Sequence, residues 1–353
     1  MSESVYASNR LRAYLQFLGA FLYFFVARSL AVRGAAGLAS GWSPLTEQAL
    51  LVFLLLIGYA GFGIWLDRQT HPIAEQGLPR REGWTREAGM GLATGWAVAL
   101  VCVLPLTLFG GISVSITPQL SAWRWLLADA AFFALAAMAE EIAFRGYAFQ
   151  RFERAVGGVG AALGFAAIYA ILQALLPGAS HSSFAVSFML ALLLSTCYLR
   201  TRALWLSWGL NFGWKASRAL VFGLAVNGVA SHSPVVQGDP MGPSWLTGGF
   251  FGLDASWLAF FVLLALLPVV FRLTGELNFR YNAPVLVPAG IPVDIDAFAR
   301  AQHEAVMGPA APTAPTLVQI GNAASGEQET GTEGSRNQGD QPTAGSDQTP
   351  IGG

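Results

Sequence analysis

Long apolar runs constrain the fold of this chain more than any other feature of its sequence. A helix needs about 20 apolar residues to cross the hydrocarbon core of a bilayer. Eight runs approach or exceed this length, at residues 14–32, 49–66, 88–109, 122–141, 156–176, 183–199, 203–226 and 256–271. We therefore predict an all-α, polytopic membrane protein with about eight transmembrane helices.

The composition supports this class and excludes others. Hydrophobic residues make up 54% of the chain and charged residues 12%, about half the charged fraction of a soluble domain. The net charge is −1, so no basic field attracts nucleic acid, and we expect no nucleic-acid partner. Both cysteines, Cys102 and Cys197, lie inside apolar runs and are interpreted as packing residues.

Arginines near the ends of the runs predict an orientation, because Lys and Arg are retained on the cytoplasmic side. Alternate connections are arginine-rich and the intervening ones carry almost none. The arginines concerned are Arg10, Arg12, Arg68, Arg80, Arg81, Arg86, Arg145, Arg151, Arg154, Arg200, Arg202, Arg272 and Arg280. We expect the protein in the plasma (inner) membrane, with both termini cytoplasmic and the Gly-rich segment 227–254 outside and irregular.

The chain is divided into four predicted parts. Residues 1–121 form N-terminal transmembrane helices, 122–228 the core helices with a polar cavity, and 229–280 an external loop and the last helix. Residues 281–353 form a cytoplasmic tail, which is expected to be disordered from about residue 308 because aliphatic residues become rare. Gly91 and Gly95 have the spacing that lets two membrane helices approach closely.

Two adjacent carboxylates, Glu140 and Glu141, end the fourth run. Carboxylates at membrane depth are expensive unless they are paired or line a wet cavity, so they mark a candidate functional site. On a helix, Glu141 and Arg145 lie four residues apart and face each other, while Glu140 points about 100° away. We predict that Glu141 pairs with Arg145 and that Glu140 serves another purpose.

Two other runs supply polar residues that could meet this pair. Asn211 and Lys215, the sole lysine, lie four residues apart in the seventh run, and Tyr169 lies in the fifth. Because a lone ammonium in a bilayer is also expensive, we expect Lys215 to pair with Glu140 or Glu141. Their depths along the helices, at about 1.5 Å per residue, predict a cavity open to the cytoplasm.

Some polar residues in the runs have a simpler interpretation. Gln173 and Ser207 are expected to join helices through hydrogen bonds worth about 0.6 kcal/mol each. Asp129, near the outer end of its run, is expected to have a structural or snorkelling role.

The segment Glu140-Glu141-Ile142-Ala143-Phe144-Arg145-Gly146-Tyr147 resembles the EExxxR motif, with its FRG-aromatic continuation, of the CPBP family of intramembrane proteases. These are the CAAX-processing and bacteriocin-processing membrane peptidases. Residues 164–169 stand where the family has FxxxH, and residues 202–215 where it has the lead into HxxxN. The resemblance covers about residues 81–228.

The resemblance implies a helical bundle that cleaves membrane-embedded or CAAX-type peptides. It implies that Glu140 activates water, that Glu141 and Arg145 hold the helix geometry, and that two His and an Asn bind metal or the oxyanion. Tyr169 and Asn211 stand at the His positions here, and Lys215 at the Asn position.

The histidines of the chain, His71, His181, His232 and His303, all lie outside the apolar runs. Because a zinc site uses neutral imidazoles, thiolates or carboxylates, we expect no metal and no other cofactor.

Three functions stay open, each with a membrane-embedded peptide or protein segment, or the lipid bilayer, among its partners. An active endopeptidase would use Glu140 as base and Tyr169, Asn211 and Lys215 as oxyanion donors. A pseudoprotease, which we favour, would keep the fold and cavity only to bind membrane segments, because an ammonium beside Glu140 weakens it as a base. A transporter-like protein would bind an anion at Lys215 and Arg218.

Overall fold

The computed structural model describes residues 2–38, 43–117 and 119–282, all of which belong to one structural unit. Eight helices coincide with the eight predicted runs, and the protein is an all-α membrane bundle. They are α1 (Ser2–Leu38), α2 (Ser43–Asp67), α4 (Trp84–Leu108), α5 (Trp123–Arg145), α7 (Gly158–Ala174), α8 (His181–Thr201), α9 (Trp205–Ala216) and α11 (Trp257–Leu273). The predicted tail, apart from its first two residues, lies outside the described residues.

The helices differ in their ability to span a membrane. In the described part of the chain, α1, α2, α4 and α8 are long and apolar enough, and α11 with α12 (Gly275–Tyr281) makes a fifth span if this pair, bent by 57°, is counted once. Helix α7 has 17 residues and α9 only 12. Each predicted run thus contains a helix, but only four or five helices in the described part of the chain have the length and hydropathy of a span, fewer than the eight predicted.

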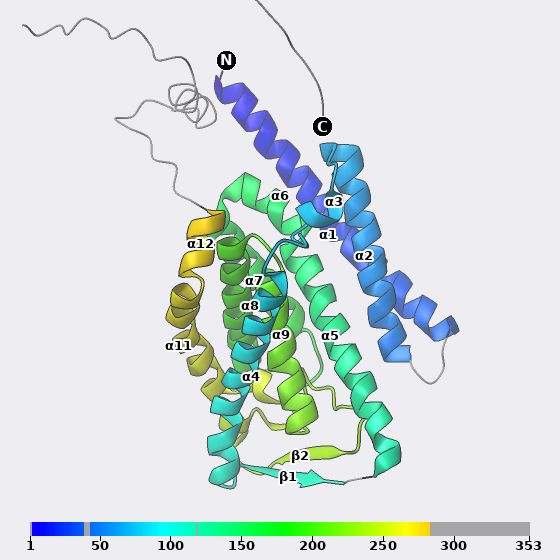
Figure 1. Cartoon of the computed structure of the whole chain (residues 1–353), viewed down its shortest axis with the longest axis vertical. Helices are drawn as coiled ribbons and strands as arrows, with labels where there is room; N and C mark the ends of the chain where they lie inside the picture. Colours follow the sequence, from blue (N-terminus) through cyan, green and yellow to red (C-terminus); the bar gives the residue numbers. More distant parts are fainter. Residues whose placement is uncertain (1, 39–42, 118, 283–353) are drawn as a thin grey trace, which may run out of the picture. The chain divides into compact units, whose positions relative to one another are not determined.

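The arginine-rich connections meet at one end of the bundle, which we call the arginine-rich end (Figure 1). Helices α3 (Pro72–Glu75), α6 (Tyr147–Val156) and α12 lie there. Contacts between separate connections hold this end together. Arg202 pairs with Glu153 at 2.8 Å and donates to Asn282, while Arg81 donates to the Thr201 carbonyl.

Two of the arginines used to predict the orientation are not loop residues. Arg145 belongs to α5 and is fully buried against Glu141, and Arg151 is fully buried against Asp67. The interpretation of these two as loop residues was wrong, because Arg145 lies in α5 and Arg151 in α6, and each pairs with a carboxylate. The alternation of arginine-rich and arginine-poor connections holds without them.

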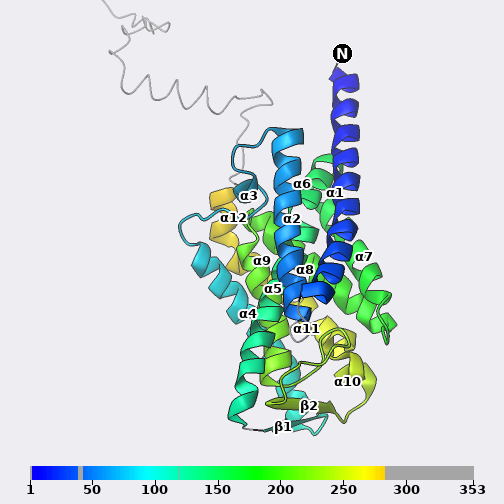
Figure 2. The ribbon, with the colours of Figure 1, turned by 90° about the vertical axis from the view of Figure 1, so that its right-hand side faces the viewer.

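The opposite end, which we call the strand end, carries an antiparallel pair of strands (Figures 1 and 2). Strand β1 (Ile112–Ile116) pairs with β2 (Val236–Pro240), with Ile112 opposite Pro240. The Gly-rich segment 227–254 is therefore more regular than predicted; it also holds the short helix α10 (Ser244–Thr247). The β-branched, alternating residues of β1 explain the pairing.

Asp129 fastens this segment to α5. Its buried carboxylate accepts a hydrogen bond from the Ser233 backbone N–H at 2.8 Å and lies 2.9 Å from His232 Nδ1. The expected structural role of Asp129 is confirmed.

Helices α4 and α9 approach each other at their glycines. A Cβ atom on Gly91 would lie 2.2 Å from the Leu206 carbonyl oxygen, and one on Gly95 the same distance from that of Leu210. No side chain fits in these places, so the small-residue spacing in α4 positions α9, which carries part of the site.

Candidate functional site

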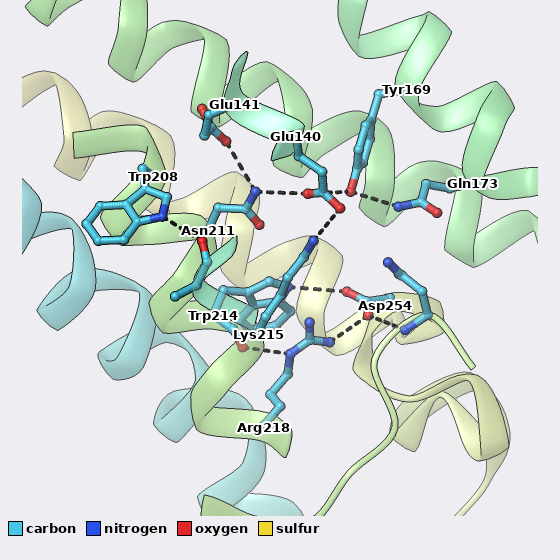
Figure 3. A network of polar contacts seen from close by, with 12 residues as sticks. Glu140, Glu141, Tyr169, Gln173, Trp208, Asn211, Trp214, Lys215, Arg218 and Asp254 are labelled. Atoms are coloured by element: carbon cyan, nitrogen blue, oxygen red, sulfur yellow. Dashed lines mark hydrogen bonds and ion pairs between the residues drawn. The ribbon is translucent and has the colours of Figure 1, made fainter. Parts of the chain in front are cut away.

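Three helices bring all six predicted site residues together. Figure 3 shows Glu140, Glu141, Tyr169, Asn211 and Lys215. Glu140, Glu141 and Arg145 come from α5, Tyr169 comes from α7, and α9 contributes Asn211 and Lys215. The four-residue spacing on α9 places its two residues on one face, which is turned toward α5.

An ion pair between Lys215 Nζ and Glu140 Oε1 lies at the centre of the site. Asn211 Nδ2 donates to the other oxygen, Oε2, at 2.9 Å, and the Tyr169 hydroxyl lies 3.5 Å from the same atom. The predicted pairing of Lys215 with a carboxylate is confirmed. Both oxygens of Glu140 therefore have a donor, although 23% of this side chain stays exposed.

The second carboxylate is enclosed and holds helices together. Arg145 Nη1 donates to Glu141 Oε1 at 2.9 Å, and Nη2 donates to the Ala191 carbonyl of α8 at 3.2 Å. Asn211 Nδ2 also donates to Glu141 Oε1, at 3.2 Å, so one amide bridges both carboxylates. Glu141 and Arg145 are buried, and the expected division of roles between Glu140 and Glu141 matches this geometry.

A further ion pair lies next to the site and was missed by the sequence reasoning. Arg218, in a π-helical turn after α9, has Nη1 2.9 Å from Asp254 Oδ2, and its Nε donates to the Trp214 carbonyl. Asp254 also accepts from Trp214 Nε1 and from the Asn227 backbone N–H. Arg218 lies in an apolar run, where a lone charge is costly, so the sequence did indicate that it needs a carboxylate partner.

These two ion pairs bear on the transporter-like alternative. Lys215 and Arg218, which were expected to bind an anion, each already contact a carboxylate. An incoming anion would have to displace an internal partner from a buried cation, which is unfavourable.

A cavity of about 350 Å³ adjoins Glu140. Its polar lining includes Glu140, Lys215, Tyr169 and Gln173, and its apolar walls come from α1, α2, α5 and α7. Gln173 donates to the Tyr169 hydroxyl at 2.8 Å, which orients the ring toward Glu140.

The cavity extends in the opposite direction from the one predicted. Its lining runs from Glu140 toward Phe132, Leu176 and Val229 at the strand end. Toward the arginine-rich end, every residue of 141–149 is buried and closes the site. The expected opening toward the arginine-rich end was wrong, because depth along a helix does not reveal which neighbouring side chains pack against it.

The residues around Glu140 do not fit a metal ion. In the part of the chain that the structure describes, no three His, Cys, Asp or Glu side chains gather as a possible metal site. Tyr169 and Asn211 offer neutral oxygens and an amide, and the Lys215 ammonium lies against the carboxylate that a cation would need. A divalent ion here would be repelled by Lys215.

The part of the chain that carries the site is also similar in sequence to a known protein family. Residues 120–217 match a family model described as type II CAAX prenyl endopeptidase Rce1-like. No curated protein and no solved structure matches the chain. The matched segment runs from just before α5 through α9 and contains all six site residues. This match supports the assignment of the chain to the CPBP family of CAAX proteases, through its Rce1-like region.

Proposed function

We propose that this protein is a CAAX-protease-like membrane protein that binds membrane-embedded peptide segments in its cavity without cleaving them. The ion pair between Lys215 and Glu140 carries the proposal. A general base must accept a proton from water in the transition state. The Lys215 ammonium contacts one oxygen of Glu140 and the Asn211 amide donates to the other, so an attacking water would have to compete with these donors for either oxygen.

The cavity supports a binding role. Its volume, about 350 Å³, lies in the range of cavities that enclose a small ligand or a few side chains. Phe24, Phe133 and Leu172 give it apolar walls, while Tyr169 and Gln173 offer hydrogen bonds. A peptide inside a membrane needs both, because its backbone polar groups have no water to bind.

The proposal is tested with the purified full-length protein and a panel of membrane-embedded and CAAX-type peptides. We expect no cleavage by the wild type and the same result for Glu140→Gln, measured by mass spectrometry of the products. A photo-crosslinking amino acid at Phe133, which lines the cavity, should capture a peptide from the panel. The same group at Leu104, which is 52% exposed on α4, serves as the control and should not.

The expected lack of cleavage needs a positive control, which shows that the assay can detect cleavage by this protein. Restoring the residues that the resemblance implies, by Tyr169→His, Asn211→His and Lys215→Asn together, is expected to create cleavage, whereas each single change is not. The three positions act on one water and one carbonyl, so their effects are strongly non-additive.

Robust cleavage by the wild type that disappears in Glu140→Gln would contradict the proposal. It would favour the active endopeptidase, in which Tyr169 and Asn211 act as neutral oxyanion donors. The partial exposure of Glu140 toward the cavity is the observation on which that alternative stands.

A further inference from the structure

A second cavity, of about 630 Å³, lies at the arginine-rich end, away from the site around Glu140. It is bounded by α1, by the C-terminal end of α2 and by α6. Its charged lining consists of Arg10, Arg12, Arg68, Arg154 and Asp67. We call this cavity the basic pocket.

The carboxylate in the basic pocket is already engaged. Asp67 Oδ1 lies 3.2 Å from Nη1 of the fully buried Arg151 and accepts from Gln16 Nε2 at 3.1 Å. Its other oxygen accepts from the Tyr147 hydroxyl at 2.6 Å. Asp67 is therefore neutralised by Arg151, and the charge that remains in the pocket belongs to arginines.

Three of these arginines have no carboxylate partner among the described residues: Arg12, Arg68 and Arg154. Among the described residues, Arg12 donates to a backbone carbonyl, that of Leu66, at 2.6 Å. Arg68 follows directly after α2, in the left-handed conformation (φ +53°) in which many helices end. Clustered guanidiniums repel one another, so the pocket is suited to an anion.

The surroundings of the basic pocket indicate which anion it binds. Guanidinium groups bind phosphate oxygens through two parallel hydrogen bonds, which makes arginine the preferred partner of phosphate. Leu66, at the end of α2, lines the pocket and is 42% exposed, and its neighbour Trp65 is 86% exposed. Exposed tryptophan is typical of the membrane–water interface, where phospholipid headgroups lie.

We propose that the basic pocket binds the phosphate headgroup of an anionic phospholipid, whose acyl chains pack against the exposed apolar side chains of Leu66 and Trp65. Free inorganic phosphate shares the headgroup chemistry but makes no use of these apolar side chains. The proposal is independent of the function proposed for the site around Glu140, since the two sites share no residue.

The test uses the purified full-length protein, stripped of lipid in detergent and titrated with phosphatidylglycerol or phosphatidylcholine. Native mass spectrometry counts the bound lipids. Phosphatidylglycerol should bind more tightly, because the choline cation of the other lipid is repelled, and its binding should weaken as salt rises.

The triple variant Arg12→Gln, Arg68→Gln and Arg154→Gln should weaken phosphatidylglycerol binding by about tenfold or more, since each arginine near an anionic lipid contributes roughly a fivefold effect. All three side chains are exposed, so the fold should survive. The matched control is Arg80→Gln, Arg86→Gln and Arg272→Gln, which removes the same charge from exposed arginines outside the pocket. It should bind the lipid like the wild type.

Two results would overturn the proposal. One is equal loss of lipid binding in both triple variants, which would mean a general charge effect without a pocket. The other is inorganic phosphate that displaces phosphatidylglycerol at the concentration of the lipid itself, which would make free phosphate the ligand.

Discussion

Lys215 and Glu140 come from helices that lie far apart in the chain, yet each satisfies the charge of the other. Lys215 is only 4% exposed, and its ammonium has nowhere else in the described site to find a carboxylate except Glu141, which Arg145 already holds. The pair is thus a structural requirement as well as a chemical one.

Removing Lys215 alone should therefore destabilise the protein more than removing both charges. We expect Lys215→Met to cost about 3 kcal/mol or more in the free energy of unfolding, because it strands a partly buried carboxylate. The double variant with Glu140→Leu should recover much of this loss. The measurement is a double-mutant cycle in denaturant, and additive effects would count against the pair.

At the residue scale, the sequence predicts partners well where helix spacing or the cost of a lone charge restricts the choice. Glu141 with Arg145 follows from helix spacing, and Lys215 with Glu140 follows from the expense of lone charges. Asp254 could not be matched with Arg218 in this way, because it lies in an irregular segment whose path has no periodicity.

At the element scale, apolar runs predict that a helix exists better than they predict where it ends. The seventh run continues to residue 226, but α9 ends at Ala216 and passes into a π-helical turn. The chain then changes direction at Gly223, which has a φ of +64°. The hydropathy of the sequence does not indicate this change of direction. The segment that forms α6 was predicted to be part of a loop, because its arginines were interpreted as loop charges. The structure shows that it is an amphipathic helix.

The close contact of α4 with α9 gives a prediction with an internal control. Gly91→Ala should destabilise the protein by about 1 to 3 kcal/mol, because its Cβ atom would overlap the Leu206 carbonyl oxygen. Gly89→Ala, two residues earlier in the same helix, has no atom within 4 Å and should be neutral or stabilising by up to about 1 kcal/mol. Thermal unfolding of the two variants makes the comparison, and equal effects would show that packing against α9 does not matter.

At the scale of the whole molecule, the grouping of arginine-rich connections at one end agrees with the proposed orientation, which places that end in the cytoplasm. Cysteine labelling tests this orientation. Met241→Cys, at a position 71% exposed near the strand end, should react with an impermeant reagent on intact cells. Glu82→Cys, at an exposed position at the arginine-rich end, should not.

The two native cysteines, Cys102 and Cys197, are buried and should give little background in this experiment. The opposite labelling pattern would reverse the orientation, and it would also place the cavity beside Glu140 in the other half of the membrane.

Composition predicted the class of the molecule because the bilayer selects for apolar helices. The direction of the cavity depends on side-chain packing, which no pattern of single residues encodes.

The helices that carry the site are the ones least able to enter a bilayer alone. Helices α1, α2 and α4 are apolar enough to insert as they leave the ribosome, whereas α5 brings Glu140, Glu141 and Arg145 with it, and α7 and α9 are short. A charge that enters the bilayer without its partner is costly. Glu141 finds Arg145 on its own helix, but Lys215, the partner of Glu140, is synthesised only 75 residues later. We therefore expect α5 to complete its insertion only after α9 has been made, so that the polar centre is assembled last.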